Sequence, residues 1–456
     1  MLKSKVAVQV ISSSMLTDDT LMLGESLLKQ WKIPQGQPVL LKFGAFRQHI
    51  KVIPVSKYDG MRISQGLAKQ MGILGSTTLR MQYKEGSSTM VVGPLIGVLV
   101  SRDYTGMPDK PFGSITMFCK ELVDGCAQNG AYVYFFTPGQ ISGSGSASDV
   151  NGWVYADGWR RTTVPAPDVV NNRLTSRKLE NKPNVQAFLK EIKQKYQSTV
   201  FNEKFLDKTE VFEALKKDSS VSRYLPESHS LRSYTTLKSM ASRYDNIFLK
   251  PVRGSLGKGI IRVTRGEGSG YMAHFATVAG ARRQQYPNLL KLYATISTKM
   301  KSIRYQIQQG LPLIEIQGRP VDFRALVQKN VSGKWSVTSI VARTAGSQHF
   351  VSNLARGGTL SRVGEAVSKS NMTSGRADAS SRLHAAALAI AKGVETNIPA
   401  HFGELGIDLA LDTGGRVWLL EVNSKPSKND NTPLNDHKIR PSVRMVIQYS
   451  RFLSGF

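Results

Sequence analysis

The chain has 456 residues, of which 41% are apolar, so it is long enough for about three domains and its composition excludes a disordered chain. Lysine and arginine total 61 against 33 aspartate and glutamate residues, which gives a formal net charge of +28 at pH 7. A field of that sign favours anionic partners, namely nucleotides, acidic polymers, anionic membrane surfaces or nucleic acids, although a generally basic surface has the same composition.

Nothing in the sequence predicts secretion or a membrane span. The two cysteines, Cys119 and Cys126, have no Cys-x-x-Cys partner or histidine cluster, and we expect both to be buried packing residues in a reducing compartment. The apolar run at residues 6–11 is too short for a secretion signal, and residues 91–100 are interrupted by glycine and proline. We therefore expect a cytoplasmic protein.

Residues 1–95 contain an internal repeat. The segment LLKQWKI at residues 27–33 recurs as LAKQMGI at residues 67–73, and each copy predicts a short helix, a turn and strands. One such unit cannot bury its apolar face alone, so we expect the two copies to pack about a pseudo-twofold axis. The interpretation is a duplicated, β-barrel-like domain of the double-psi kind, with chance similarity as the alternative. It carries no cluster of reactive side chains, which favours a docking role.

Residues 96–174 predict a small α/β unit. A buried strand at residues 94–100, a helix at 112–128 and a strand at 132–136 have the spacing of such a unit. A hairpin is expected at residues 153–164, and residues 165–243 are expected to be mostly helical. Lys208, which opens a helix after Asp207, is a candidate phosphate ligand, with an ordinary surface lysine as the alternative.

The most informative stretch is IFLKPVRGSLGKGIIRV at residues 247–263. Two short apolar strands flank a glycine-rich turn, and Lys250 ends the first strand. Glycines allow backbone N–H groups to approach phosphate oxygens closely, so the stretch predicts a hairpin that folds over a polyphosphate. The spacing does not fit a Walker loop, and a plain β-turn is the alternative. The residues of this hairpin that we expect at the phosphates are Gly254, Ser255, Leu256, Gly257, Lys258 and Gly259.

Four more elements are predicted between this hairpin and residue 343. They are a helix at 273–300, a strand at 303–311 that runs into a linker, and strands at 320–329 and 335–343. Asp322 and Arg324 lie two residues apart and therefore share one strand face. Arg343 and Asn353 follow.

The last pattern is a hairpin of two apolar strands at residues 402–426. Glu421 and Asn423 share one face, and Asp408 lies on the partner strand. Oxygen side chains inside apolar strands are costly to bury unless a cation compensates them, and Mg²⁺ binds such groups together with phosphate oxygens. A pair of surface-facing carboxylates is the alternative.

Taken in order, these elements resemble the ATP-grasp superfamily across residues 175–456. The chain looks most similar to the spore-coat-associated YheC/YheD family of endospore-forming bacteria, including the segment Gly93-Pro94-Leu95-Ile96-Gly97. The resemblance implies an α+β fold in which two subdomains clamp ATP. The units would be 1–95, 96–174 (a pre-ATP-grasp unit) and 175–456.

The resemblance also implies a role for each candidate. Lys250 and Lys208 would bind the α- and β-phosphates, Arg324, Arg343 and Asn353 would act on the transferred phosphoryl group, and Asp408, Glu421 and Asn423 would bind Mg²⁺, or Mn²⁺ in its place. The hinge beside adenine would be Gln308, Gln309, Gly310 and Leu311, although such hinges often begin with glutamate. Glu315 would meet the ribose.

The implied function is an ATP-dependent carboxylate–amine ligase that forms an acyl-phosphate, acting on an acidic peptide or cell-envelope component. The first alternative is a spore coat or assembly protein that binds nucleotide without turnover. The second, suggested by the charge, is a nucleic-acid-binding protein, but no helix-turn-helix, zinc-finger or aromatic RNA-binding motif accompanies it.

Overall fold

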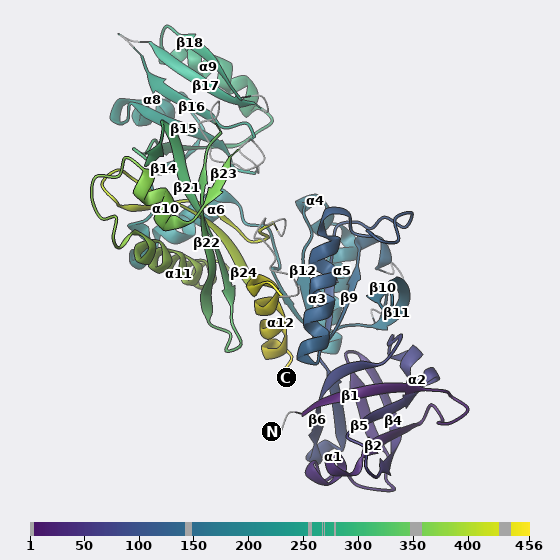
Figure 1. Ribbon diagram of the computed structural model, residues 1–456. Coiled ribbons are helices and arrows are strands. Elements are labelled where there is room, and N and C mark those ends of the chain that lie inside the picture. Colours follow the sequence, from purple (N-terminus) through teal and green to yellow (C-terminus); the bar gives the residue numbers. More distant parts are fainter. Residues whose placement is uncertain are drawn as a thin grey trace.

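The molecule is elongated, with a barrel at one end, an α/β unit beside it and a large lobe of two sheets at the other end (Figure 1). The computed structural model describes residues 4–141, 148–253, 258–266, 268, 270–277, 280–346, 358–427 and 439–456. Within these residues the strands form one closed barrel and three six-stranded sheets.

The N-terminal barrel has seven strands in the order β1-β5-β2-β4-β3-β7-β6. Both copies of the sequence repeat place a short helix directly after one of two neighbouring strands, α1 after β2 and α2 after β5. Leu27 and Leu67, at matching repeat positions, are both buried. A double-psi arrangement of these strands stays a prediction. The elements are β1 (Ser4–Ile11), β2 (Thr20–Gly24), α1 (Glu25–Gln30), β3 (Val39–Phe43), β4 (Phe46–Val55), β5 (Gly60–Ser64), α2 (Gln65–Gln70), β6 (Thr77–Lys84) and β7 (Thr89–Gly93).

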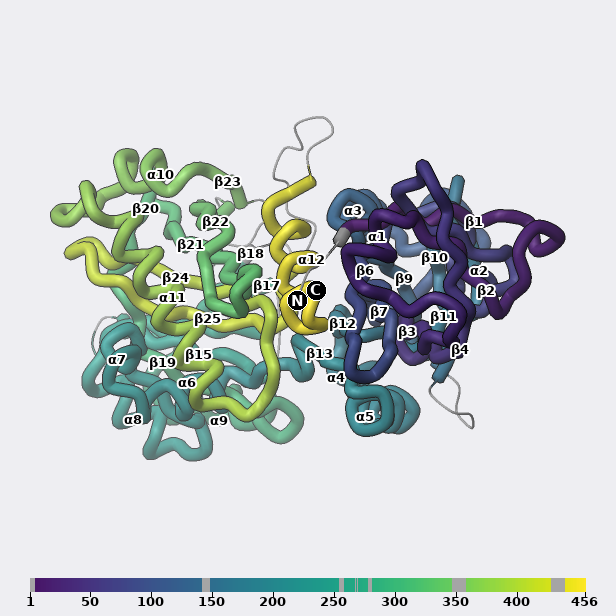
Figure 2. Tube along the Cα trace, turned by 90° about the horizontal axis from the view of Figure 1, so that it is seen from below, coloured from purple at the N-terminus to yellow at the C-terminus, as the bar shows by residue number. Residues whose placement is uncertain are grey.

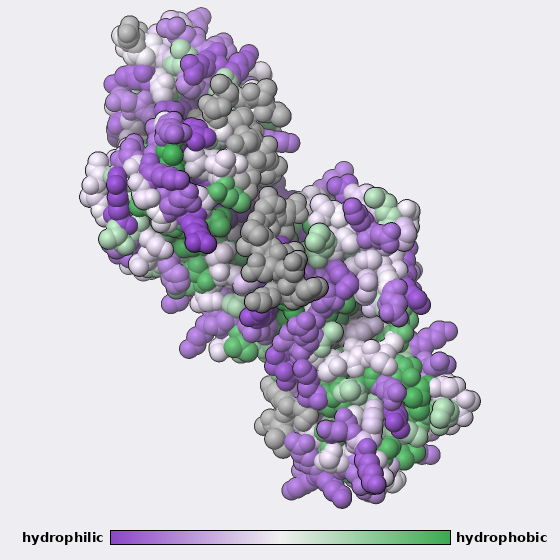
Figure 3. Space-filling view, viewed as in Figure 1, coloured by the Kyte–Doolittle hydropathy of each residue, from purple (hydrophilic) through white to green (hydrophobic). Residues whose placement is uncertain are grey.

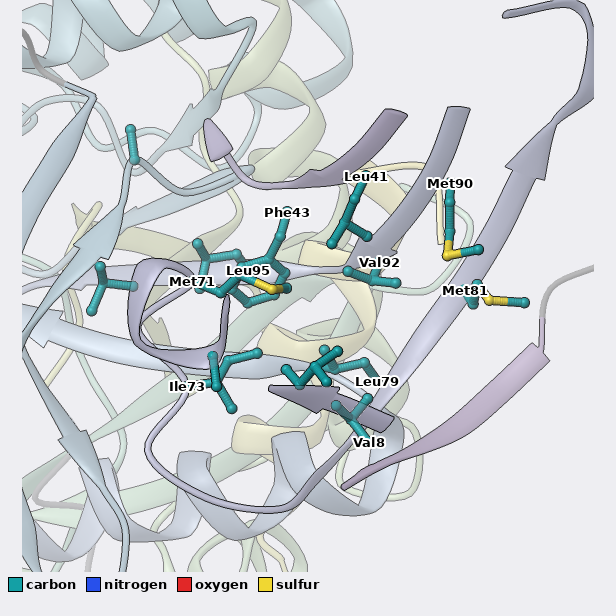
Figure 4. Packing of buried hydrophobic residues seen from close by; sticks show 14 of the residues in the cluster. Val8, Leu41, Phe43, Met71, Ile73, Leu79, Met81, Met90, Val92 and Leu95 are labelled. Carbon is teal, nitrogen blue, oxygen red and sulfur yellow. The ribbon is translucent and has the colours of Figure 1, made fainter. Parts of the chain in front are cut away.

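The barrel core continues into the α/β unit. Leu41, Met71, Leu79 and Met90 converge from different elements in the barrel interior (Figure 4). Leu95, the first residue of the next strand, belongs to the same buried cluster. Because one close-packed core joins the two units, the barrel does not move freely relative to the α/β unit.

The α/β unit has the strand order β11-β10-β9-β8-β12-β13, in which β9, β8, β12 and β13 run parallel. Alternation along β8 turns Ile96 and Val98 toward α3 and α12, and Leu95 and Leu99 toward α5 and the barrel. The elements are β8 (Leu95–Leu99), α3 (Thr116–Asn129), β9 (Tyr132–Phe136), β10 (Asp149–Tyr155), β11 (Trp159–Pro165), β12 (Val169–Asn172), α4 (Arg177–Glu180), α5 (Pro183–Tyr196) and β13 (Thr199–Phe201).

The upper sheet of the large lobe, residues 228–309, has the order β14-β19-β15-β16-β17-β18. Two helices pack on one face, where the core includes Leu249, Val263 and Leu292. The elements are β14 (Ser228–Leu231), α8 (Tyr234–Arg243), β15 (Asn246–Pro251), β16 (Ile261–Arg265), β17 (Tyr271–Thr277), β18 (Gly280–Tyr286), α9 (Leu289–Met300) and β19 (Tyr305–Gln309).

The lower sheet, residues 315–423, has the order β23-β22-β21-β24-β25, with β20 paired to β21. Its core is built on α11, whose Leu383, Ile390 and Val394 are fully buried. The elements are α6 (Lys208–Lys216), α7 (Ser219–Ser222), β20 (Glu315–Ile316), β21 (Arg319–Lys329), β22 (Trp335–Thr344), β23 (Thr359–Ser361), α10 (Val363–Lys369), α11 (Ala379–Asn397), β24 (Glu404–Leu411), β25 (Val417–Asn423) and α12 (Pro441–Leu453).

Helix α12 lies between the two halves of the molecule (Figure 2), packed against α3 on one side and β21 on the other. The residues after it reach the barrel, since Gln82 donates a hydrogen bond to the carbonyl oxygen of Gly455 at 2.7 Å. On the face shown in Figure 3, hydrophilic residues cover much of the upper sheet, and larger hydrophobic patches lie over the barrel. Among the described residues, no helix is long and apolar enough to cross a membrane.

Two expected helical stretches contain strands. Residues 165–243 include β12, β13 and β14, which are only three or four residues long and too short to show a periodicity. Residues 273–286 form most of the hairpin β17–β18, and the helix begins only at Leu289. The sheet of the α/β unit also extends past residue 174 through β13, so the division at residues 95 and 174 stays a prediction.

Substitution of Gly125 should weaken the contact between α3 and α12. A Cβ atom at this position would lie 2.5 Å from Cδ1 of Ile447 and 3.3 Å from Cδ1 of Ile439. We expect Gly125→Val to lower the free energy of unfolding by about 2 kcal/mol through overpacking. Denaturant unfolding measures this free energy. The control is Ala127→Val, on the exposed face of the same helix. Equal effects of the two substitutions would contradict this packing.

Candidate functional site

The two sheets of the large lobe face each other through charged side chains. On β15 the alternation buries Ile247 and Leu249 in the upper core and turns Phe248 and Lys250 to the opposite face. Burial lowers the pKa of Lys250 to about 8, and the carboxylates Glu421, Asp408 and Asp322 of the lower sheet oppose that shift. Lys250 therefore points from the upper sheet toward the acidic groups of the lower sheet.

Strand register in the lower sheet gathers those groups. Arg324 on β21 lies directly opposite Asp408 on β24, which lies opposite Glu421 on β25. Asp322, two residues before Arg324, lies opposite Arg343 on β22. Directly opposed side chains on one face are close neighbours. Four strands thus bring residues separated by about a hundred positions to one surface.

Asp408 is held by two guanidinium groups. Arg324 donates to both of its oxygens, to Oδ2 at 3.1 Å, and Nη2 of Arg343 lies 3.2 Å from Oδ1. Burial alone would raise the pKa of Asp408, but the two arginines outweigh it and hold the pKa below its usual value. Arg343 also binds Asp322 with two bonds of 2.6 and 2.8 Å. Burial would lower the pKa of Arg343, yet these two carboxylates raise it.

Glu421 reaches its position through a β-bulge. The register of β24 with β25 shifts after Asp408, so Leu420 is the extra residue between the paired positions Leu419 and Glu421. A bulge re-aims the following side chains, and here it sets Glu421 opposite Asp408. Nζ of Lys208, at the start of α6, lies 3.1 Å from Oε1 of Glu421. The two lysines predicted from the sequence therefore converge on the same carboxylate.

The predicted hinge residues are firmly held. Gln308 accepts a hydrogen bond from Lys250 and donates one to Ser228 at 3.0 Å. The backbone N–H groups of Gln309 and Gly310 donate to the carbonyl oxygens of Glu227 at 2.9 Å and Asn246 at 2.7 Å. A Cβ atom on Gly310 would lie 2.5 Å from that same Asn246 oxygen, so only glycine fits there. Leu311 begins the segment that links the two sheets.

Glu315 lies on β20 beyond this linker. Its backbone N–H donates to the side chain of Asn371 at 2.8 Å. Its carboxylate interacts electrostatically with Arg262 of the upper sheet, whose pKa is lowered by burial and raised by Glu315. This is a second charge pair between the two sheets, and residue spacing alone does not predict it.

Part of the predicted site lies outside the described residues. This holds for Gly254, Ser255, Leu256 and Gly257 of the glycine hairpin and for Asn353. Lys258 is exposed, and Gly259 has a φ of 74°, a backbone conformation that favours glycine. Phe248 is not among the residues predicted from the sequence, although it lies two residues before Lys250 and therefore on the same strand face.

A buried polar network, which the sequence pattern did not predict, joins the end of β25 to the α/β unit. Lys425 pairs with Glu180, and Arg173 pairs with Glu404 and donates to the carbonyl oxygen of Pro426 at 2.7 Å. Burial lowers the pKa of Lys425 to about 8, and Glu180 opposes the shift. Buried ions require such pairing. The network fixes the segment that follows Asn423 against the neighbouring unit.

The oxygen donors fit a hard divalent cation. Glu421 and Asn423 share a strand face, and Asp408 lies opposite Glu421. Two carboxylates and one amide oxygen match the ligand preference of Mg²⁺. No cluster of three or more acidic, histidine or cysteine side chains that could hold a metal occurs within the described ranges. In the structure Arg324 and Arg343 neutralise Asp408 and Lys208 neutralises Glu421, so a cation bound there would compete with these groups.

Comparison with known proteins gives one family and two curated relatives. The family model described as YheC/D like ATP-grasp matches residues 197–453, more than half of the chain. The endospore coat-associated protein YheD of Bacillus subtilis (strain 168) is 31% identical over 368 residues, which cover 80% of each chain. The endospore coat-associated protein YheC of the same organism is 25% identical over 59% of this chain and 73% of its own.

Among solved structures, the VanG D-Ala:D-Ser ligase of Enterococcus faecalis matches with a TM-score of 0.48 and 13% identity. The match covers 80% of this chain and 99% of that one.

Loss of one carboxylate should destabilise the lower sheet. Asp322 and Arg343 are both about nine-tenths buried as side chains. Asp322→Asn removes one of the two charges that compensate Arg343, and we expect the free energy of unfolding to fall by about 3 kcal/mol. Asp245→Asn, at an exposed pair with Arg265, is the control and should have almost no effect. Similar losses for both variants in denaturant unfolding would contradict the assignment.

Proposed function

The chain belongs to the YheC/D-like ATP-grasp family, and we propose that it is an ATP- and Mg²⁺-dependent carboxylate–amine ligase. The observation that carries the proposal is the convergence of Lys250 and Lys208 on Glu421, with Asp408 opposite. Lysines from two separate elements that converge on carboxylates have the charge arrangement that a metal–polyphosphate needs.

The nucleotide would lie between the two sheets. Lys250 and Lys208 would turn from Glu421 to the α- and β-phosphates, and the hairpin at residues 254–259 would cover them. The N–H groups of Gln309 and Gly310 are already engaged by the protein, so the backbone of Leu311 is the group we assign to the adenine edge. Phe248 would pack on the base, and Glu315 would accept hydrogen bonds from the ribose.

Asp408, Glu421 and Asn423 would hold Mg²⁺, or Mn²⁺ in its place. Bound there, the ion screens the negative charge of the phosphates. Arg324 and Arg343 donate to Asp408 in this structure and have further guanidinium N–H groups to offer. We assign them, with Asn353, to the oxygens of the transferred phosphoryl group.

The reaction follows from the charges. A substrate carboxylate oxygen attacks the γ-phosphorus of ATP, the bond from phosphorus to the β,γ-bridging oxygen breaks, and ADP leaves. Two anions must approach each other, so the lysines and arginines lower the barrier by neutralising them. An amine then attacks the acyl-phosphate carbon, loses its proton to water, and displaces phosphate to give an amide. No side-chain nucleophile takes part.

The proposed setting is the spore. Both curated relatives are named endospore coat-associated proteins, which supports a cytoplasmic, spore-associated role and an acidic peptide or envelope component as substrate. The strongly basic composition supports an anionic partner.

The direct test is ADP release in a screen of amino acids and acidic peptides with Mg²⁺. We expect Glu421→Gln to reduce ADP formation at least a hundredfold because the cation loses a charged ligand. The control is Glu213→Gln, which loses an exposed carboxylate of α6. Tight ATP binding without ADP formation across the screen would favour the alternative, a nucleotide-binding coat or assembly protein without turnover. Absence of nucleotide binding would contradict both.

Nucleotide affinity should depend on pH through Lys250. Its pKa of about 8 in the free protein means that the amine loses charge as the pH rises through this value. Phosphates favour the protonated form, so binding should take up protons and weaken between pH 7 and pH 9. Calorimetry of ADP·Mg²⁺ in two buffers of different ionisation enthalpy measures the uptake. Lys250→Arg, which stays charged, should remove it, and persistent uptake in that variant would assign the proton to another group.

A further inference from the structure

A cavity of about 410 Å³ lies beside the proposed phosphate site and has no role in the function proposed above. Its walls are the start of α6, the ends of β14 and β15 and the start of β19. This volume is within the range of small-molecule pockets. Its polar lining residues are Asp207, Thr209, Glu210, Ser230, Arg232, Arg253 and Arg304.

Strand register sets where this cavity lies relative to the phosphate lysine. Lys250, Gln306 and Ser230 are paired in one row across β15, β19 and β14. Val252 follows two residues after Lys250 and donates its backbone N–H to Arg304 at 2.9 Å. Residues two apart share a strand face and lie ~7 Å apart. The cavity therefore lies on the same face of the sheet as Lys250, displaced along the strand by about two residues.

The charges in the cavity do not cancel. Glu210 is already paired with Lys204 at 2.6 Å. Asp207 caps α6 by accepting from the N–H of Thr209 at 3.0 Å, and it lies 3.6 Å from Nε of Arg253. Within the part of the chain that the structure describes, Arg232 and Arg304 have no carboxylate partner. Two exposed guanidinium groups are thus left facing the cavity without compensation.

A buried hydroxyl also lacks a partner there. Oγ1 of Thr209 is buried and has no hydrogen-bond partner among the described residues. This oxygen has almost no accessible surface and lies behind the cavity wall, so the case for a bound group rests on the arginines. The helix N-terminus does not account for the site, since Asp207 takes its first N–H groups.

We propose that this arginine cavity binds a carboxylate of the substrate. Guanidinium groups bind carboxylates through paired N–H donors. The proposal rests on the ligase function: the cavity lies two residues along the strands from Lys250, so a substrate held there by one carboxylate can bring a second carboxylate to the phosphates. The substrate is then a dicarboxylate, either an acidic amino acid or an acidic side chain next to a chain terminus. Phosphate shares the same oxyanion chemistry and is the competing ligand.

Calorimetric titration with glutarate, butyrate and inorganic phosphate tests this, without and with saturating ADP·Mg²⁺. We expect glutarate to bind the wild-type protein more tightly than butyrate does, and Arg232→Gln/Arg304→Gln to weaken it at least tenfold. The control is Arg283→Gln on the exposed edge strand β18. It removes a similar charge and should leave glutarate binding unchanged.

Three results would overturn the proposal. They are glutarate binding that the double variant does not change, absence of glutarate binding at millimolar concentration, and binding of phosphate alone with loss in the double variant. Binding of ADP·Mg²⁺ is measured in the same samples. If it persists in the double variant while glutarate binding is absent, the cavity proposal fails and the ligase proposal stands. If ADP·Mg²⁺ does not bind the wild-type protein, the ligase proposal fails.

Discussion

Opposite charges facing each other across a cleft are the constraint on which the large lobe depends. Lys250 of the upper sheet has lost part of its hydration, and the carboxylates of the lower sheet, together with Gln308 of its own sheet, compensate it. Those carboxylates are in turn compensated by Arg324, Arg343 and Lys208. The lower sheet therefore carries its own counter-charges, whereas the charge of Lys250 depends on the opposite sheet, because a buried charge without a partner is expensive. Lys250 therefore favours the arrangement in which the two sheets face each other.

The same strands separate packing from chemistry by simple alternation. On β24 the residues Leu405, Ile407 and Leu409 enter the core of α11, and the residues between them face the cleft or the neighbouring unit. Along that second face Glu404 binds Arg173 of the α/β unit and Asp408 binds the arginines of the cleft. One strand thus supports the fold on one side and orients charged groups on the other.

Much of the fold and of the candidate site was predictable from local sequence patterns. The repeat, the glycine hairpin strands and the spacing of Asp322 with Arg324 and of Glu421 with Asn423 follow from periodicity, since residues two apart share a strand face. Which strands become neighbours does not follow from local pattern. Neither the pairing of Arg324 with Asp408 nor the bulge at Leu420 has a local signal, because both depend on contacts between distant segments. The hairpin β17–β18 lies where a helix was predicted, because four consecutive polar residues, 282–285, interrupt the alternation expected of its outer strand.

The account is tested most directly by a crystal structure of the protein with a non-hydrolysable ATP analogue and Mn²⁺, using the anomalous signal of manganese to locate the metal. It predicts one nucleotide between the two sheets, with Lys250 at the phosphates and a manganese peak bound by Glu421. A nucleotide that contacts only one sheet, or a manganese peak away from Glu421 and Asp408, would contradict it.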